Sequence, residues 1–378
     1  MSDRATHLHQ SPWAGVFYTT GGGVSLFSEM LGTPGASATV LEATVPYAQQ
    51  SLTDLLGRKP DQATARTTAR QMATVAWRRA RQLAPEHSQL LGFGCTASLA
   101  TNRTKRGRHR AHWAIQTATS SYCFTVEFDR QISRETQETL LVDSIWQSFN
   151  RALHRSEQQI DFSAVGIEHF SDMTSHAPAN YLPLLEASPY RVCTQDDDGL
   201  LLLPGSFNPI HDGHVELLKT AEELTGRSGA FELAVQNADK PPLDFISIEQ
   251  RLQRIHTHPV WLTNTPRFTD KAQLFPGAVF ALGTDTLVRI GQLKFYQGYQ
   301  PLLQAALQTF HDNKIRFLVF GRRQDNKFVH LDDLDIPDAL RALCEGVDED
   351  AFRADISSSE LREHTRQAKR ERRQQYDA

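Results

Sequence analysis

The stretch that decides the fold spans residues 200–218 and reads LLLLPGSFNPIHDGHVELL. An apolar run that ends at Pro204 and Gly205 is typical of a buried strand in a parallel sheet. The Val-x-Leu-Leu spacing after Gly213 predicts a helix that packs back onto this strand. Because backbone amides and the positive end of that helix face the carboxyl edge of the sheet, the stretch predicts a phosphate-binding site in an open α/β fold.

Two histidines supply the chemistry of this predicted site. His211 and His214 are three residues apart at the helix start, so both side chains can point toward a bound phosphate. Taken alone, an H-x-x-H spacing also fits a pair of metal ligands or two solvated loop histidines.

The residues from Gly205 to His214 read Gly-Ser-Phe-Asn-Pro-x-His-x-Gly-His. This pattern resembles the signature of the nucleotidyltransferase superfamily, the adenylyl- and cytidylyltransferases that include nicotinate/nicotinamide mononucleotide adenylyltransferase. The resemblance implies a Rossmann-like domain in which His211 and His214 are catalytic. It also implies nucleotide contacts from four neighbouring residues: Gly205, Ser206, Phe207 and Gly213.

Length and composition limit the number of domains, the kinds of partner and the cellular compartment to be expected. A chain of 378 residues suggests two domains, each large enough to bury a core. A net charge of -4 gives no reason to expect nucleic acid or a membrane surface as a partner. The cysteines show no C-x-x-C spacing, so neither a disulfide framework nor a zinc site is indicated. No apolar run reaches the roughly 18 residues that span a bilayer, and no signal-peptide core precedes residue 12, so we expect a cytoplasmic protein.

The first half of the chain opens with a second strand–glycine–helix pattern. Residues 15–20 predict a short strand that runs into Gly21-Gly22-Gly23, and residues 24–31 predict a helix. Such a glycine cluster either cradles an anion or forms a simple tight turn. A longer helix is predicted over residues 64–83, with four arginines expected on its solvated face: Arg70, Arg78, Arg79 and Arg81.

Three short motifs follow the glycines: Pro34-Gly35, the strand from Val40 to Tyr47, and Leu55-Leu56-Gly57. They resemble the start of the CinA carboxy-terminal domain, the nicotinamide mononucleotide amidohydrolase family, and the resemblance covers residues 1–150. It implies an α/β domain in which Tyr47 matches the family tyrosine.

The catalytic positions of that family match less closely. Thr19 or Thr20 is the hydroxyl nearest to the family's serine, and Leu52 stands where the deamidases carry a catalytic lysine. A nucleophilic hydroxyl needs a base, so we expect a binding or degenerate module rather than an active amidohydrolase. Lys105 is a candidate substitute for the lysine, in a basic run over residues 101–110 that fits either a solvated hairpin or a phosphate contact.

A stretch of low periodicity separates the two halves. Residues 171–199 mix Ser, Pro and Asn with an acidic run, so we expect the domain junction there. The predicted organisation is α/β throughout: a CinA-like domain over residues 1–170, a linker over 171–199, and a Rossmann-like nucleotidyltransferase domain over 200–378.

Later strand ends of the second half also carry residues suited to a nucleotide. Residues 231–235 predict a strand that opens into a loop with Asn237 and Lys240, which the resemblance places beside the acceptor. Another predicted strand runs into Gly283 and Asp285, which are similar to the family's Gly-x-Asp motif. The Asp285 carboxylate can accept hydrogen bonds from a ribose or a base.

Two further motifs complete the predicted nucleotide site. Arg322 follows a strand predicted over residues 315–320 and fits either a phosphate contact or a surface salt bridge. Residues 355–362 read DISSSELR and resemble the family's Ile-Ser-Ser-Thr-x-x-Arg signature. Hydroxyls, free helix amides and a guanidinium there suit the β- and γ-phosphates. The residues implied are Ser357, Ser358, Ser359 and a catalytic Arg362.

Together the motifs predict in-line attack of an acceptor phosphate on the α-phosphorus of ATP, with release of pyrophosphate. This chemistry needs positioning and charge neutralisation more than a protein nucleophile, so we expect Mg²⁺ with ATP and no protein-bound metal site. The Asn-Ala-Asp-Lys-Pro-Pro loop and the fused domain favour nicotinamide or nicotinate mononucleotide as acceptor, a step of NAD biosynthesis.

Fold analogy leaves other functions open. A cytidylyltransferase, a pantetheine-phosphate adenylyltransferase and a nucleotide-binding regulatory protein with degenerate sites are the alternatives. The sequence predicts no nucleic-acid or membrane partner, and it leaves a homo-oligomer open.

Overall fold

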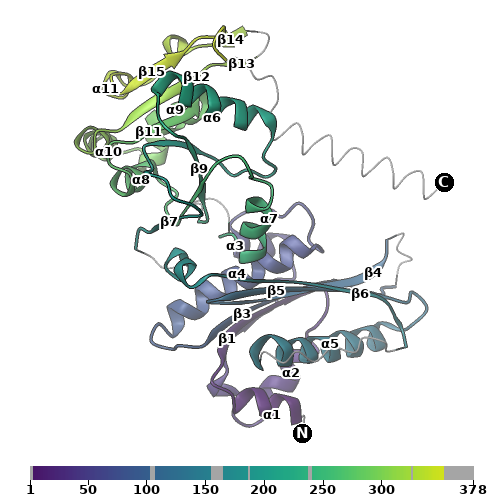
Figure 1. Ribbon diagram of the computed structural model, residues 1–378. Coiled ribbons are helices and arrows are strands. Elements are labelled where there is room, and N and C mark those ends of the chain that lie inside the picture. Colours follow the sequence, from purple (N-terminus) through teal and green to yellow (C-terminus); the bar gives the residue numbers. More distant parts are fainter. Residues whose placement is uncertain are drawn as a thin grey trace, which may run out of the picture. The chain divides into compact units, whose positions relative to one another are not determined.

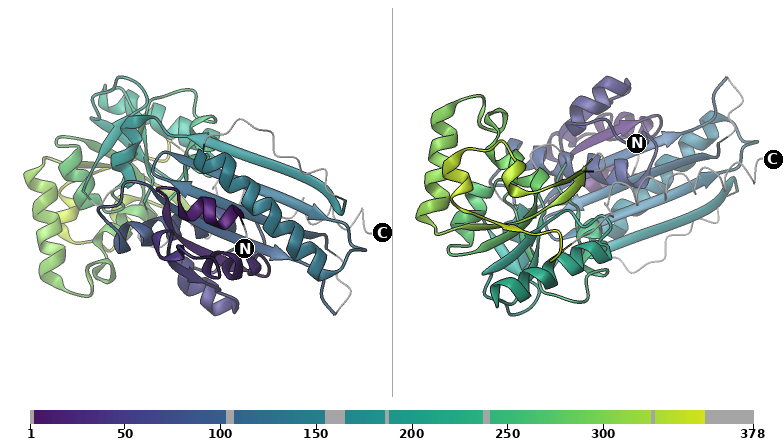
Figure 2. Two further views of the ribbon diagram at one scale, coloured as in Figure 1. Left: turned by 90° about the horizontal axis from the view of Figure 1, so that it is seen from below. Right: turned by 90° about the horizontal axis from the view of Figure 1, so that it is seen from above.

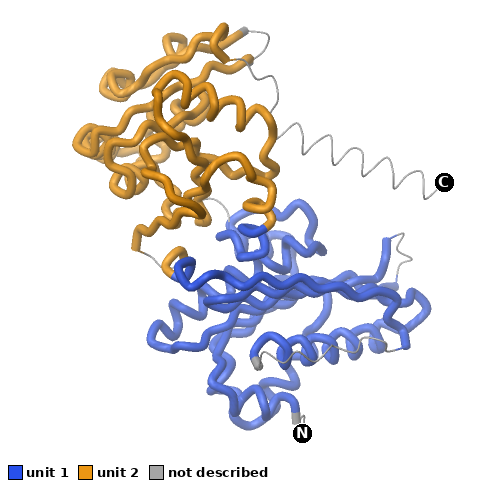
Figure 3. Tube along the Cα trace, viewed as in Figure 1, with its two compact units in different colours: residues 1–182, 237–249 blue, residues 183–236, 250–378 orange. Residues whose placement is uncertain are grey.

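The chain folds into two compact α/β units. A computed structural model describes residues 3–102, 107–154, 165–185, 188–236, 241–324 and 327–352. The first unit comprises Met1–Leu182 and Asn237–Glu249, and the second comprises Pro183–Gln236 and Gln250–Ala378 (Figure 3). This division differs from the expected boundaries at three places. Of the expected linker, residues 171–182 belong to the first unit and residues 183–199 to the second, and residues 237–249 of the expected second domain belong to the first unit.

The first unit is built on a six-stranded mixed sheet (Figure 1). Its strand order is β2-β1-β3-β4-β5-β6. The strands β2, β1 and β3 are parallel, and each later strand is antiparallel to its neighbour. The bounds are β1 Ala14–Thr20, β2 Val40–Thr44, β3 Leu90–Ser98, β4 His109–Thr117, β5 Ser120–Phe128 and β6 Ile167–His176.

Helices cover both faces of this sheet. One face carries α1 (Asp3–His9), α2 (Ser25–Leu31) and α5 (Arg134–His154), and Figure 2 shows α5 running along the strands. Alternate residues of β3, β4 and β5 point into that layer and form an aromatic core with α5, including Phe93, Trp113, Phe124 and Phe149. The other face carries α4 (Arg66–Leu83), with α3 (Gln49–Leu56) beside it; a short 3₁₀ helix, η1 (Ala36–Ala38), precedes β2.

Two glycines of β3 allow α4 to lie directly on the sheet. A Cβ atom at Gly92 would meet the carbonyl oxygen of Ala73 at 2.1 Å, and one at Gly94 would meet that of Ala69 at 2.5 Å. Because real Cβ atoms do not approach backbone this closely, any side chain at either position forces the helix away from the strand.

The second unit is built on a seven-stranded sheet with the order β15-β12-β11-β8-β9-β10-β7. Six strands are parallel, and the edge strand β7 is antiparallel to β10. Counted along the chain, the parallel strands have the order 3-2-1-4-5-6, as in a doubly wound sheet. The bounds are β7 Arg191–Cys193, β8 Leu201–Pro204, β9 Ala230–Ala234, β10 Val260–Thr263, β11 Val279–Gly283, β12 Arg316–Phe320 and β15 Cys344–Val347.

The strand order determines where a ligand can bind. Strand β8 pairs with β9 on one side and with β11 on the other, so the direction of winding reverses between β8 and β11. In folds of this kind, the loops after two such strands leave the same edge of the sheet in opposite directions, and ligands bind at that edge. The predicted Rossmann-like α/β arrangement of the second half is confirmed.

The remaining elements of the second unit connect and cover these strands (Figure 1). Core residues Phe275, Phe280, Phe310 and Phe317 pack between the sheet and its helices. The helices are α6 Asp212–Thr225, α8 Phe268–Leu274, α9 Thr284–Gly291, α10 Gln300–Asp312 and α11 Asp338–Arg341. The minor elements are η3 Leu293–Tyr296, η4 Leu331–Asp333 and the hairpin β13 Arg322–Gln324 and β14 Lys327–Val329. Two elements begin in the first unit and end in the second: η2 Ala179–Leu185 and α7 Phe245–Leu252. Among the helices in the described ranges, none has the length and apolarity needed to cross a membrane.

The close approach of α4 to β3 gives a stability prediction. We expect Gly92→Ala to lower the free energy of unfolding by about 2 kcal/mol, because the added methyl group overpacks the contact with Ala73. Urea unfolding followed by far-UV circular dichroism measures the change. Gly107→Ala is the matched control, since a Cβ atom at Gly107 meets nothing within 4 Å. Equal stability of the two variants would contradict the packing argument.

Candidate functional site

The loop after β8 is shaped by one buried aromatic ring. Phe207 is 1% exposed, has a positive φ of 43°, and packs edge-on against Phe231 at 5.0 Å between ring centroids. Its ring also covers Gly205, where a Cβ atom would lie 2.5 Å from the ring. The following peptide, Asn208-Pro209, is cis. Glycine at position 205 is therefore required by the inward turn of Phe207, while the Ser206 side chain beside them is exposed.

Helix α6 begins directly after this loop, with His211 as its N-cap in an extended conformation. The backbone N–H of His211 donates a hydrogen bond to Nδ1 of His214 at 3.3 Å. The two imidazole rings lie 3.7 Å apart between centroids, and Phe207 contacts the His214 ring edge-on at 5.3 Å. Gly213, between the histidines, is buried in the first turn of the helix. The structure thus brings the two predicted catalytic residues together at a helix N-terminus.

The hydrogen bond to His214 fixes its tautomer. Because Nδ1 accepts a hydrogen bond from the backbone N–H, the neutral ring carries its proton on Nε2. Burial lowers the pKa of both histidines, and for His214 it combines with the neighbouring His211 to bring the pKa to about 4. At neutral pH the pair is therefore uncharged and offers N–H donors. Binding of a polyphosphate would raise both pKa values, since a nearby anion favours the imidazolium form.

The strand next to β8 contributes a second group of predicted residues. Gly283 is the N-cap of α9, and open space surrounds the position of its missing Cβ atom. Asp285 lies in the first turn of α9 and forms an ion pair with Arg322, which begins β13 after β12. Both side chains of this pair are about half exposed. The pairing arises because β11 and β12 are parallel neighbours that end at the same edge of the sheet.

One residue outside the predicted set also contacts the β8–α6 loop. The guanidinium of Arg251, on α7, donates from Nε to the backbone carbonyl of Ser206 at 3.0 Å. The sequence places Arg251 on a predicted helix. It does not reveal that the side chain binds the carbonyl of Ser206, because the two residues lie far apart along the chain.

Several predicted residues lie outside the described part of the structure. They are Lys105, Asn237, Lys240, Ser357, Ser358, Ser359 and Arg362. The expected acceptor loop and the expected β,γ-phosphate site therefore remain predictions. Within the described ranges, no group of three His, Cys, Asp or Glu side chains is arranged to hold a metal ion.

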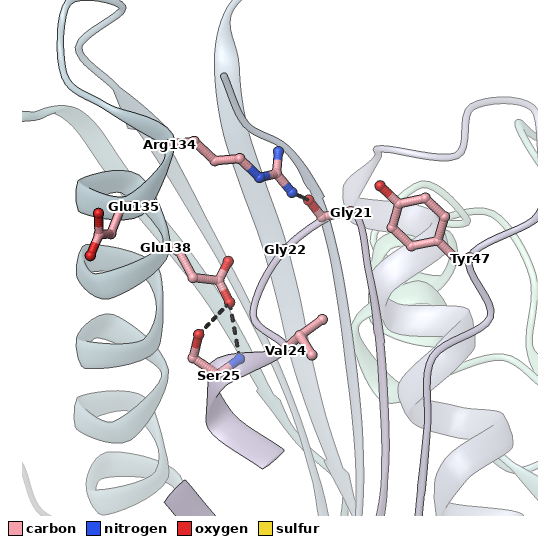
Figure 4. A pocket seen from close by; sticks show the side chains of 8 residues that line it. All are labelled: Gly21, Gly22, Val24, Ser25, Tyr47, Arg134, Glu135 and Glu138. Atoms are coloured by element: carbon pink, nitrogen blue, oxygen red, sulfur yellow. Dashed lines mark hydrogen bonds between the residues drawn. The ribbon is translucent and has the colours of Figure 1, made fainter. Parts of the chain in front are cut away.

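The glycine turn of the first unit borders a pocket of about 450 Å³. Its lining residues are Gly21, Gly22, Val24, Ser25, Tyr47, Arg134, Glu135 and Glu138 (Figure 4). The carboxylate of Glu138 accepts hydrogen bonds from the N–H of Gly23 at 2.8 Å and from the N–H and hydroxyl of Ser25 at 3.0 and 3.1 Å. The amides that form an anion cradle in the sequence prediction thus already bind a carboxylate from α5.

Of the other residues expected at this site, one lines the pocket and the rest are buried away from it. Tyr47 lines the pocket and is 70% exposed. Thr19 and Thr20 are buried in β1 and do not line the pocket, and Leu52 is buried in α3. Besides the phenol of Tyr47, a hydroxyl at the pocket belongs to Ser25, whose carboxylate partner Glu138 lies too far along the chain for sequence spacing to reveal it.

The second unit thus combines a doubly wound parallel sheet with paired histidines at a helix N-terminus, beside the point where the winding reverses. This combination defines an α/β domain with a Rossmann-like fold. Residues 202–364 match the family model described as cytidylyltransferase-like, which supports a nucleotidyltransferase-type activity for this part of the chain. No match to the chain was found among curated proteins.

A solved structure of the competence/damage inducible protein CihA from Agrobacterium tumefaciens is similar to part of the chain. The alignment covers 39% of this chain and 92% of CihA, at 18% sequence identity and a TM-score of 0.31. A TM-score of this size is too low to relate the two folds.

The lowered pKa of His214 gives a prediction about pH and stability. The unfolded chain binds a proton at His214 near pH 6.5, whereas the folded ring does so only near pH 4. The contribution of the neutral His214 ring to the free energy of unfolding is therefore fully present above about pH 6.5, and it is lost as the pH falls toward 4. We expect the stability difference between the wild type and His214→Gln to shift against the wild type over this interval.

Urea unfolding of both proteins at several pH values between 7.5 and 4.5 measures this shift. His311→Gln serves as control, since His311 is an exposed residue of α10. A stability difference between wild type and His214→Gln that stays constant with pH would contradict the assignment.

Proposed function

We propose that the second unit transfers the adenylyl group of ATP to the phosphate of nicotinamide or nicotinate mononucleotide and releases pyrophosphate. The observation that carries this proposal is the closely packed pair of His211 and His214 at the start of α6, which follows β8 where the winding of the sheet reverses. The cytidylyltransferase-like match supports the reaction class. The acceptor rests on the resemblance of the β8–α6 loop to adenylyltransferases that use pyridine mononucleotides.

In the proposed reaction, an oxygen of the acceptor phosphate attacks the α-phosphorus in line. A new P–O bond forms while the bond from the α-phosphorus to the oxygen that bridges the α- and β-phosphates breaks. His214 donates from Nε2, and His211 from its ring N–H, to the oxygens of the α-phosphate. The positive end of the α6 dipole stabilises the same charge. Because the rings are neutral before ATP binds, their interaction with the phosphates strengthens as negative charge accumulates.

The other predicted residues receive roles in the same proposal. The Asp285 carboxylate accepts hydrogen bonds from the ribose, and its ion pair with Arg322 holds it in position. Glycines at 205, 213 and 283 let the ligand approach the backbone. Ser206 and Phe207 shape the loop around the nucleotide, Ser357, Ser358, Ser359 and Arg362 bind the β- and γ-phosphates, and Asn237 and Lys240 contact the acceptor.

Magnesium accompanies ATP in this proposal. Phosphate oxygens and water would hold the ion, which is the usual preference of Mg²⁺. Its chemistry is charge neutralisation on the triphosphate.

For the first unit we propose a binding or structural role without amidohydrolase activity. The carboxylate of Glu138 fills the glycine turn, and the two candidate threonines do not line the pocket. For Lys105 and Tyr47 we propose only what the resemblance implies: Lys105 as a substitute for the family's lysine, and Tyr47 as the match to the family's tyrosine.

Removal of His214 tests the reaction. We expect His214→Ala to lower kcat by about 100-fold or more, because it removes a donor that acts on charge developing in the transition state. Pyrophosphate release in a coupled assay measures kcat, and far-UV circular dichroism checks the fold. His311→Ala, on the exposed surface of α10, should keep wild-type turnover. Unchanged pyrophosphate release by His214→Ala would reject the role of the histidine pair.

The acceptor is tested by incubating the wild type with ATP or CTP and each candidate acceptor, then reading the products by mass. We expect a dinucleotide from ATP and a pyridine mononucleotide. A product formed only with CTP, or only with pantetheine phosphate, would establish one of the alternative transferases. Tight ATP binding with no product from any acceptor would favour a regulatory nucleotide-binding protein.

A further inference from the structure

The core of the second unit contains a buried ion pair. Lys271 of α8 and Glu232 of β9 are 4% and 0% exposed, and the Lys271 Nζ lies 2.5 Å from a carboxylate oxygen of Glu232. The other carboxylate oxygen accepts a hydrogen bond from the hydroxyl of Thr263 on β10, which is also fully buried. One helix and one neighbouring strand therefore bind the same carboxylate, and all three residues belong to the second unit.

This pair ties β9 to its neighbours in a specific way. An ion pair requires one partner in one geometry, whereas apolar side chains can slide past one another at little cost. Removing one partner leaves a buried charge unpaired, which is strongly destabilising, but replacing both charges by neutral groups of similar volume is often tolerated. The positional effect of the pair can therefore be separated from its effect on stability.

Strand β9 also holds the β8–α6 loop of the candidate site, at two adjacent residues. The backbone carbonyl of Glu232 accepts a hydrogen bond from the N–H of Gly205 at 2.9 Å. The ring of Phe231 packs edge-on against that of Phe207 at 5.0 Å between centroids, and Phe207 contacts the His214 ring at 5.3 Å. The first residue of the loop and its buried ring therefore both take their positions from β9.

The pleat of β9 connects these contacts to the ion pair. Successive side chains of a strand point to opposite faces of the sheet, so Phe231 packs against the loop while Glu232 meets α8 on the other face. A shift of β9 that separates Glu232 from Lys271 would move the Glu232 carbonyl and the Phe231 ring as well. The loop is thus coupled to the buried pair through one short stretch of backbone.

We propose that Glu232 and Lys271 are positioning residues for the histidine pair: by fixing β9 against α8, they maintain the two contacts of that strand with the β8–α6 loop and so orient His214. Both side chains act through the backbone of β9 and are not in contact with a substrate. The kinetic part of this inference rests on the proposed adenylyl transfer, whereas its structural part does not.

The test uses the double variant Glu232→Gln with Lys271→Met in the full chain. It removes both charges, keeps side chains of similar length, and retains an amide oxygen that can accept the hydrogen bond from Thr263. Hydrogen–deuterium exchange of a peptide spanning residues 201–214 reports on the loop, including the Gly205 amide itself. We expect exchange there to become about tenfold faster, because local opening of the loop becomes easier.

The pKa of His214 provides a second readout, which a general loss of stability does not change. Burial and the neighbouring His211 lower this pKa to about 4. A loop that opens more often exposes the ring to water, so we expect the pKa to rise by about 1 in the double variant. NMR titration of the histidine ring protons in the folded protein measures it, and the spectrum of His214→Gln identifies the signal.

Turnover provides the kinetic readout. We expect kcat of the double variant to fall about tenfold with KM for ATP changed less than about twofold, because positioning acts mainly on the transition state.

Leu340→Ala is the control for lost stability. Leu340 is fully buried on α11, which precedes the edge strand β15, and the strands β12, β11 and β8 separate β15 from β9. The substitution destabilises the core of the second unit, yet it should leave loop exchange and kcat within about twofold of the wild type and the His214 pKa unchanged. Far-UV circular dichroism checks that each variant is folded.

The proposal is overturned if loop exchange or the His214 pKa of the double variant stays at the wild-type value, or if Leu340→Ala changes both as much. Should the double variant not fold, Thr263→Val takes its place, since it removes one hydrogen bond to Glu232 and leaves the ion pair intact. Loop exchange should then become about twofold faster, and exchange at the wild-type rate would overturn the proposal equally.

Failure of the proposed reaction would look different. A wild type that forms no dinucleotide rejects adenylyl transfer, yet the exchange and titration measurements still decide whether the buried pair positions the loop.

Discussion

The burial of the Phe207 ring is the interaction on which the candidate site depends. Full burial of a phenyl ring contributes about 2 kcal/mol, enough to hold this residue in the left-handed backbone conformation that bulky side chains rarely adopt. The ring needs the space that glycine leaves at position 205, and it contacts the His214 imidazole edge-on. The packing of Gly205, Phe207 and His214 is therefore interdependent, so a substitution at one of these residues disturbs the positions of the others.

The electrostatics of the two glycine turns differ because neutral imidazoles lie at one of them and a carboxylate lies at the other. In the second unit, the start of α6 presents neutral imidazoles whose N–H groups can meet an incoming anion. In the first unit, the corresponding amides already bind the Glu138 carboxylate, so a second anion at the same amides would be repelled. A similar strand–turn–helix pattern therefore has N–H groups of two histidines at its helix start in one unit and amides that already bind a carboxylate in the other.

Buried charge also explains why the chain does not divide at a single linker. Arg70 and Asp244 lie far apart in sequence, yet each is buried and needs the other. This requirement brings residues 241–249 into the first unit. The expected solvated position of Arg70 is therefore wrong, because the residues that cover it come from a distant part of the chain. The second unit has its own buried pair, in which Glu232 of β9 contacts Lys271 of α8. Each pair specifies a long-range contact that apolar packing alone would leave less defined.

The sequence by itself determined the parallel strand before Pro204, the helix with His211 and His214 at its start, and the strand ends that carry Asp285 and Arg322. These features are local: period, glycine, proline and capping positions lie within a few residues of one another. Only the tertiary structure decided that Asp285 pairs with Arg322, that Glu138 fills the first glycine turn, that Phe207 turns inward, and that Arg70 is buried against Asp244. Each of these depends on residues distant in sequence that packing brings together, and no spacing within a single stretch records such a contact.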